Sequence, residues 1–209
     1  MFEEIENKRG QSKALTILAI FVLVATITGV AVAAYTWNFT GSNNTIGTGN
    51  ISMSLLESND TINITNALPI TEATGMTLGD NDSFDFAITT KASGAPGNIS
   101  YNISITKVGV DSGYTALKDS DVKVYLVSFV GETETPVVAP TLVSSIITSG
   151  STGTLASNIT HNHTTANQTK TTNYKLRMWV DEKVDASSWT ASTKNQYKLK
   201  VSTSGTLSA

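Results

Sequence analysis

The chain has 209 residues, a net charge of −3, an isoelectric point near 5.3 and no cysteine. Because it has no basic stripe to neutralise phosphates, the composition argues against nucleic acid as a partner. The lack of cysteine excludes disulfides, thiolate catalysis and zinc–thiolate sites. Apolar residues make up 40% of the chain, which is enough for one domain with a hydrophobic core.

An apolar segment near the N-terminus predicts export. Residues 14–34 contain no charged side chain and are about long enough to cross a bilayer as a helix. Lys8, Arg9 and Lys13 precede this segment, and positive charge on that side holds the N-terminal end in the cytoplasm. We therefore expect the rest of the chain to be extracellular or at the cell surface.

The sequence leaves three fates open for residues 1–34. The preferred one is a signal peptide, cleaved at the small-residue run that contains Ala33 and Ala34. A cut between Gly10 and Gln11 would instead retain the helix, and the Lys-Arg-Gly-Gln context there resembles the processing site of archaeal type IV pilins and archaellins. The third alternative is an uncleaved membrane anchor.

From Tyr35 onward, apolar residues recur at every second position, which is the period of a half-buried β-strand. The runs with this alternation are Tyr35–Phe39, Ile51–Leu55, Phe84–Ile88, Ile99–Ile105, Val122–Leu126, Tyr174–Val180 and Tyr197–Val201. Turns rich in glycine separate several of them. The pattern predicts a mainly β fold, with an antiparallel β-sandwich over residues 47–209, a separate strand within 35–46 and a hydrophobic helix or signal segment over 1–34.

Two stretches lack this alternation. We expect residues 156–172 to form a long exposed loop and residues 184–193 to hold one helical turn near Trp189. His161 and His163 fall in the first stretch. Without a third ligand nearby, a solvent-exposed position is favoured for them over a metal site.

Motifs for catalysis are missing. The sequence contains no H-E-x-x-H, G-x-S-x-G or P-loop motif. Asp80, Asp82 and Asp85 surround a glycine turn, but the glutamate that completes an EF-hand loop is not there, so a plain loop is favoured over a calcium site. We therefore expect no enzyme activity, no metal and no cofactor.

Asparagine is placed in an unusual way. About a quarter of the residues are Ser or Thr, and eleven Asn residues begin an N-x-[ST] sequon. They are Asn38, Asn43, Asn50, Asn59, Asn63, Asn81, Asn98, Asn102, Asn158, Asn162 and Asn167. Such sequons are acceptors of N-linked glycans on exported proteins, so the excess favours a glycan-coated surface. The alternative is that Asn and Thr simply populate strands and turns.

Several short motifs, taken in order, resemble the TasA/camelysin-like matrix fibre proteins of bacteria and the similar archaeal bundling pilins. They are a small-residue run leading to Ala34-Tyr35-Thr36-Trp37, a glycine-marked strand entry at 47–55, an F-x-F run at 82–88, the segment Tyr174–Glu182 and a closing strand Tyr197–Val201. Residues 107–172 carry none of the resemblance.

The resemblance implies a jelly-roll-like sandwich that polymerises by donor-strand exchange, in which the mature N-terminus of one subunit fills a groove in its neighbour. Tyr35, Trp37 and Phe39 are the candidate donor-strand residues in this chain. A one-sided aromatic ladder left in water would promote aggregation, whereas insertion into a partner would bury it. The alternative places these rings at the membrane–water boundary as an interfacial belt.

Together these features predict a structural subunit of an extracellular filament, such as a pilus or biofilm matrix fibre, with a role in adhesion. Its partners would be identical subunits and N-linked glycans, with membrane contact only during export. One alternative is a type IV pilin-like subunit whose helix 14–34 forms the filament core. The other is a membrane-anchored surface adhesion domain. The density of sequons leans towards an archaeal source.

Overall fold

The computed structural model describes residues 36–40, 44–48, 51–57, 61–93, 96–187, 189 and 194–208. At 36–40, 44–48, 51–54, 56–57, 81 and 206–208 it describes the backbone alone. The chain divides into two compact units, Met1–Thr36 and Trp37–Ala209. The expected signal segment 1–34, its cleavage residues Ala33 and Ala34, and Tyr35 all lie outside the described residues.

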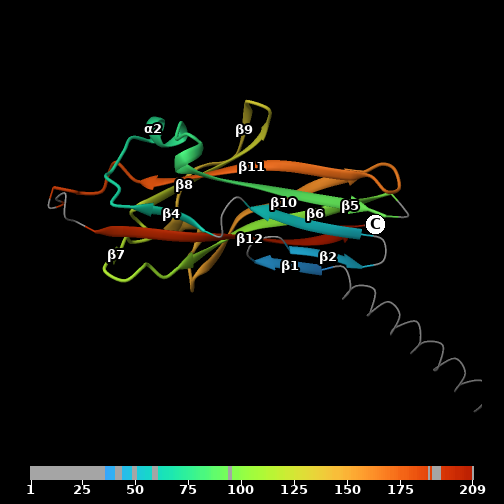
Figure 1. Cartoon of the computed structure of the whole chain (residues 1–209), viewed down its shortest axis with the longest axis horizontal. Helices are drawn as coiled ribbons and strands as arrows, with labels where there is room; N and C mark the ends of the chain where they lie inside the picture. Colours follow the sequence, from blue (N-terminus) through green and yellow to red (C-terminus); the bar gives the residue numbers. More distant parts are fainter. Residues whose placement is uncertain are drawn as a thin grey trace, which may run out of the picture. The chain divides into compact units, whose positions relative to one another are not determined.

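The described strands form two six-stranded sheets (Figure 1). Sheet A has the order β1–β12–β6–β10, and β4 and β7 also pair with β12. Its strands are β1 (Thr36–Thr40), β4 (Ile62–Thr65), β6 (Gly97–Val108), β7 (Thr115–Ala116), β10 (Thr152–His163) and β12 (Asn195–Ser208). Sheet B has the order β2–β3–β5–β11–β8–β9. Its strands are β2 (Asn44–Thr48), β3 (Ile51–Glu57), β5 (Ser83–Ala92), β8 (Val122–Val130), β9 (Thr133–Leu142) and β11 (Thr169–Val180).

The long strand pairs β12–β6, β6–β10, β3–β5, β5–β11, β11–β8 and β8–β9 are antiparallel. A short contact between β7 and β12 is parallel. These pairings confirm the expected mainly β, antiparallel two-sheet sandwich.

Helical structure is sparse in the described ranges. α2 covers Glu72–Met76, α3 covers Val143–Ile146, and a 3-10 turn, η1, covers Asp80–Asp82. Thr71 caps α2, because its hydroxyl accepts a hydrogen bond from the Thr74 amide at 3.3 Å. None of these helices is long and apolar enough to span a membrane.

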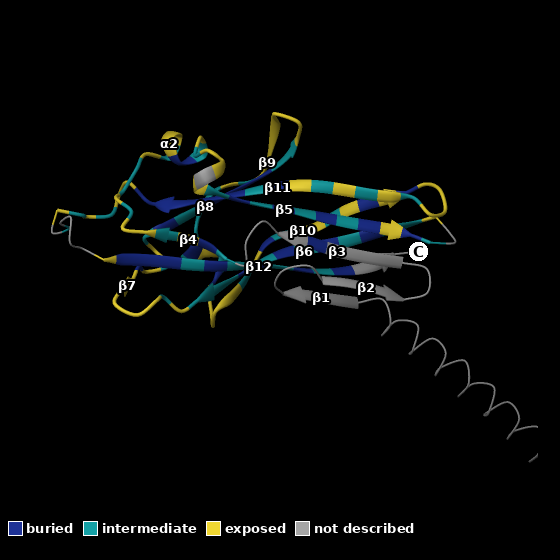
Figure 2. Ribbon diagram, in the orientation of Figure 1, coloured by how far each residue is buried: buried dark blue, intermediate teal, exposed yellow. Residues whose placement is uncertain are grey.

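The main core lies between the two sheets and follows the alternation in the sequence. Along β5 and β6, every second side chain is buried, including Phe84, Phe86 and Ile88 from one sheet and Ile99 and Ile103 from the other. Figure 2 shows the same alternation as dark bands along the strands. Burial of these apolar side chains is the main favourable contribution to folding, since the chain has no disulfide.

A second, smaller core covers the outer face of sheet B. Tyr125, Val127 and Trp179 are buried there beneath Ile70 and the segment that contains α2. An ion pair fastens this segment to β8, because Lys123 Nζ lies 2.7 Å from a carboxylate oxygen of Glu72.

The expected exposed loop at 156–172 is wrong. β10 continues to His163 and β11 begins at Thr169, so that only residues 164–168 connect the two strands. The register of β10 shifts between Thr154 and Ile159, which is the signature of a β-bulge. The bulge interrupts the alternation of inward and outward side chains, which is why the sequence pattern of a strand was hidden. Near Trp189, where one helical turn was expected, its amide donates a hydrogen bond of 2.9 Å to the Ala186 carbonyl. Residues 188 and 190–193 lie outside the described residues, so the helical turn stays a prediction.

Glycine is required where α2 meets sheet B. A Cβ atom at Gly75 would lie 2.3 Å from Trp179 Cδ2, whereas one at Gly79 would have no neighbour within 4 Å.

We predict that Gly75→Ala lowers the free energy of unfolding by about 1–3 kcal/mol, because the buried indole must move. Gly79→Ala is the matched control and should change stability little. Thermal unfolding followed by circular dichroism measures both, and equal melting temperatures for the two variants would contradict the packing.

Candidate functional site

The candidate donor strand forms an edge of sheet A. Trp37 and Phe39 lie two residues apart in β1, and β1 pairs with β12 (Figure 1). The following residues, Asn44–Thr48, form β2 and pair with β3 in the other sheet. The segment 35–46 therefore contributes to two strands in different sheets, and the expected start of the sandwich at residue 47 lies inside β2.

β12 is the strand against which β1 lies. It is 14 residues long, and one flank pairs with β6 from Lys198 to Ser208. The other flank pairs first with β4, at Gln196–Leu199, and then with β1. Leu199 and Val201 of β12 are fully buried, so the inner face of sheet A at this strand is part of the core. A strand that pairs with the β1 side of β12 therefore extends an already packed sheet.

β9, an edge strand of sheet B, has residues that hinder pairing with a further strand. Pro136 and Pro140 in β9 have no amide hydrogen to donate to a neighbouring strand. Glu134 in the same strand accepts two hydrogen bonds of 2.7 Å from the guanidinium of Arg177, which is 5% exposed. The Arg177 hydrogen bonds hold the pKa of the Glu134 carboxyl below its usual value, with a smaller contribution from Lys175.

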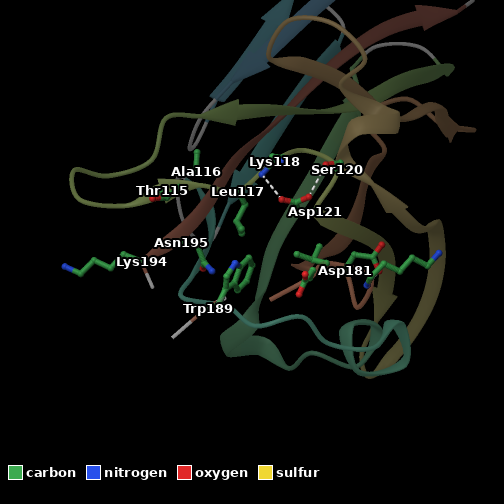
Figure 3. Close-up of a pocket in the computed structure, with 13 residues that line it drawn as sticks. Thr115, Ala116, Leu117, Lys118, Ser120, Asp121, Asp181, Trp189, Lys194 and Asn195 are labelled. Carbon is green, nitrogen blue, oxygen red and sulfur yellow. Dashed lines mark hydrogen bonds between the residues drawn. The ribbon is translucent and has the colours of Figure 1, made fainter. Parts of the chain in front are cut away.

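A cavity of about 680 Å³ lies at the end of the sandwich where β7 meets the start of β12 (Figure 3). Trp189, Asn195, Asp121 and Asp181 contribute to its wall. Asp121 accepts hydrogen bonds from the Ser120 hydroxyl at 3.0 Å and from the Lys118 amide at 3.3 Å. The side-chain oxygen Oδ1 of Asn195 is buried and has no hydrogen-bond partner among the described residues.

The carboxylates of this cavity already have partners. Asp181 lies 3.5 Å from Lys123 Nζ and accepts a hydrogen bond of 3.4 Å from the Lys183 amide. Within the part of the chain that the structure describes, no group of three or more His, Cys, Asp or Glu side chains is placed to hold a metal ion. Asp80 pairs with Lys175 in an exposed position, and Asp85 lies 4.0 Å from the same amine.

The expected exposure of His161 and His163 is wrong, since their side chains are 7% and 1% exposed. Both face the space between the sheets and share the hydroxyl of Thr90, at 2.7 Å from His161 Nδ1 and 2.9 Å from His163 Nε2. The neighbouring Asn162 is exposed, because side chains alternate along β10. The sequon at Asn162 therefore gave no information about its two neighbours.

The histidines belong to a polar network that links the sheets. His161 Nε2 lies 2.8 Å from the Thr172 hydroxyl and 3.2 Å from the Tyr101 hydroxyl. Tyr101 in turn lies 2.7 Å from the hydroxyl of Tyr174. These residues come from β5, β6, β10 and β11, and sequence reasoning had assigned Tyr101 and Tyr174 only to the apolar core. The sequence did hold one indication of this network, because each inward-facing tyrosine carries a hydroxyl that needs a hydrogen-bond partner when buried.

Burial keeps this network uncharged. Desolvation lowers the pKa of His161 to about 4, and the neighbouring His163 and Lys170 act in the same direction. Burial also lowers the pKa of His163, against a smaller opposite effect of the Gln168 backbone. It raises the pKa values of both tyrosines. A neutral network of hydrogen bonds positions the sheets but offers no strong base.

The sequons are distributed unevenly over the described residues. Asn63, Asn158, Asn162 and Asn167 are exposed, whereas Asn98 and Asn102 are half-buried on β6. Asn38 lies in β1 and Asn81 in η1, where the description covers the backbone alone. Asn43, Asn50 and Asn59 lie outside the described residues.

Comparisons with known proteins give no family. No family model and no curated protein matches the chain. The VP2 subviral particle of infectious bursal disease virus has a TM-score of 0.36 and 13% identity, over 75% of this chain and 32% of that one. The Salmonella enterica trimeric lipoprotein SadB has a TM-score of 0.23 and 11% identity, over 87% of this chain and 79% of that one. This chain thus spans about a third of the capsid protein, and likenesses this weak carry no argument about function.

The buried histidines make stability depend on pH. The pKa of His161 is about 4 in the folded chain and near 6.5 when it is unfolded, so the unfolded chain binds more protons between these values. Its contribution to stability is therefore complete above pH 6.5 and is lost as the pH falls towards 4.

We predict a melting temperature that declines from pH 6.5 to pH 4. The slope should be smaller in His161→Gln, because glutamine does not titrate. Differential scanning calorimetry of both proteins measures the two slopes. The absolute stability of the variant is not the readout, and identical slopes would show that His161 is not the responsible group.

Proposed function

We propose that this chain is a structural subunit of an extracellular filament, in which β1 of one copy pairs with β12 of the next. The observation that carries the proposal is the edge position of β1, which among the described strands pairs with β12 alone. The aromatic residues Trp37 and Phe39 lie in this strand.

Exchange between copies requires no new kind of contact. The main-chain groups of β1 would meet the same β12 partners whether the strand came from its own chain or from a neighbour. A head-to-tail contact of this kind generates an open filament when its rotation does not close into a ring. Burial of aromatic side chains in the partner would add about 2 kcal/mol for each ring before the cost of ordering.

Further observations support this reading over a catalytic one. The chain passes from β5 in sheet B to β6 in sheet A. It passes again from β9 in sheet B to β10 in sheet A, then to β11 in sheet B and back to β12 in sheet A. Repeated crossings of this kind are expected of a jelly-roll-like sandwich. The order of motifs that resembles the TasA/camelysin-like proteins includes both β1 and β12. A neutral and largely buried network such as the one around His161 suits a structural domain.

A type IV pilin-like subunit is the second candidate. The observation in its favour is in the sequence, where Lys8, Arg9 and Gly10 precede Gln11 and the uncharged segment 14–34 follows. In that arrangement the apolar segment would form the filament core. The mature N-terminus distinguishes the two candidates, since a start near Tyr35 requires cleavage at Ala33 or Ala34 and a start at Gln11 retains the segment.

The aromatic residues of β1 should be needed for assembly. We predict that the double variant Trp37→Ser/Phe39→Ser is secreted in normal amount but forms no filaments, because the exchanged strand loses its apolar anchors. The matched control is Val130→Ser/Val137→Ser, which changes two exposed apolar residues of the β8–β9 hairpin. Electron microscopy of cell surfaces and supernatants gives the readout. Normal filaments from the first variant would contradict donor-strand exchange.

The lack of cysteine allows a direct test of which chain supplies β1. Thr36→Cys would be expressed together with a second chain that carries Ser202→Cys, Ser204→Cys or Thr206→Cys in β12. We predict covalent dimers between the two single-cysteine chains for at least one pairing, measured by non-reducing electrophoresis of assembled material. A doubly substituted chain that forms only an internal disulfide, with no dimers in the mixtures, would show that β1 stays in its own subunit.

A further inference from the structure

β10 is the exposed edge of sheet A opposite β1. It pairs with β6 from Thr152 opposite Thr106 to His163 opposite Gly97, and no other strand of the described part of the chain pairs with it. Its outer flank therefore presents main-chain donors and acceptors over a strand of 12 residues. Such an edge is a template for pairing with another chain.

The amino-acid sequence of β10 gives this edge little ordinary protection. The strand contains no Lys, Arg, Asp, Glu or Pro, whereas β9 at the edge of sheet B has Glu134, Pro136 and Pro140. The bulge between Thr154 and Ile159 distorts part of β10. Charges, prolines and bulges are the usual means of blocking an edge strand, and β10 has only the bulge, so the rest of the strand needs another means.

The two sequons of β10 are placed where glycans could protect this edge. Asn158 and Asn162 are exposed, and Asn158 lies at the bulge with a φ of 57°. Each sequon begins with Asn and ends two residues later with Thr160 or Thr164. Because residues two apart in a strand lie on the same face, the Asn and the Thr of each sequon are both exposed to solvent. On the inner face, His161 and His163 are buried, so modification at the asparagines would not disturb the core.

We propose that N-linked glycans on Asn158 and Asn162 cover the free edge of β10 and prevent edge-to-edge pairing of subunits. The inference rests on the proposed function, since it requires export. In the transfer, a bond forms between the side-chain amide nitrogen and C1 of the first sugar. The bond from C1 to the phosphate of a lipid-linked oligosaccharide donor breaks, and the amide proton leaves with the phosphate.

The two sequons of the neighbouring strand β6 stay unmodified. Asn98 and Asn102 are half-buried in a strand that has β12 on one side and β10 on the other. Asn98 lies directly opposite Asn162, at a cross-strand spacing of about 5 Å that leaves room for one glycan. The side-chain oxygen of Asn102 accepts a hydrogen bond of 2.9 Å from the backbone N–H of Asn158.

Glycans on one edge give assembly a direction. With β10 covered and β9 blocked by proline, two of the sheet edges are closed to pairing, and the flank of β12 that holds β1 stays available to a strand from another subunit. Copies then join end to end and are kept from joining side by side through β10.

Peptide mapping of protein taken from its native host tests the modification. Cleavage after lysine gives one peptide, residues 92–107, that contains Asn98 and Asn102, and another, 124–170, that contains Asn158, Asn162 and Asn167. We expect glycan mass at Asn158 and Asn162, assigned by electron-transfer fragmentation, and an unmodified peptide 92–107. Unmodified Asn158 and Asn162 in exported protein would overturn the proposal.

A pair of matched variants tests the role of the glycans. Thr160→Ala/Thr164→Ala removes both β10 sequons while it keeps Asn158 at its positive φ, and Ser100→Ala/Ser104→Ala removes both β6 sequons. Thr160 and Ser100 are hydrogen-bonded to each other at 3.0 Å, so each variant loses that bond. The first should lose two glycan masses and associate laterally in light scattering, and the second should change neither.

The outcome is separate from that of the filament proposal. Filaments built from protein with unmodified β10 would overturn the glycan inference and leave the filament intact. Glycans on β10 of a protein that never forms filaments would support the inference and count against the filament. Loss of both glycans without a change in lateral association would overturn the covering role.

Discussion

Burial of the inner faces of two sheets against each other is the interaction on which this structure depends. The chain has no disulfide, and its charged residues are few. Stability must therefore come from apolar side chains that alternate along β5, β6, β11 and β12 and meet between the sheets. This arrangement needs every strand to keep its register, because a shift by one residue would turn its apolar side chains to the solvent.

A two-sheet sandwich necessarily leaves edges, and these edges organise the surface chemistry of the chain. Prolines and an ion pair between Glu134 and Arg177 occupy the β9 edge. Two sequons lie on the β10 edge. β1 closes the flank of β12, where it makes a contact that a second copy can reproduce. The proposed filament and the proposed glycan cover are thus two answers to the same physical problem of unpaired main-chain groups.

Polar groups inside the sandwich restrict how the sheets meet. Thr90, His161 and Tyr101 join β5, β10 and β6 by hydrogen bonds whose directions are fixed, whereas apolar contacts alone would tolerate sliding. Desolvation holds the histidines neutral, so the same network that specifies the packing weakens it in acid. A domain without disulfides gains a defined core from this network, and with it a sensitivity to low pH.

The sequence by itself determined the fold class, because the alternating runs fall in strands wherever the structure describes them, from Thr36–Thr40 to β12. It did not identify β4, β7 or β9, which are short or at sheet edges and have little apolar alternation to reveal them. In β10, the bulge near Asn158 broke the period, and the histidines were placed in solvent. Only the tertiary structure decided that His161 is buried, since its partners Thr90 and Tyr101 lie 71 and 60 residues away in the sequence. Local periodicity reports which face a residue takes, whereas hydrogen-bond partners and sheet edges depend on how distant strands pair.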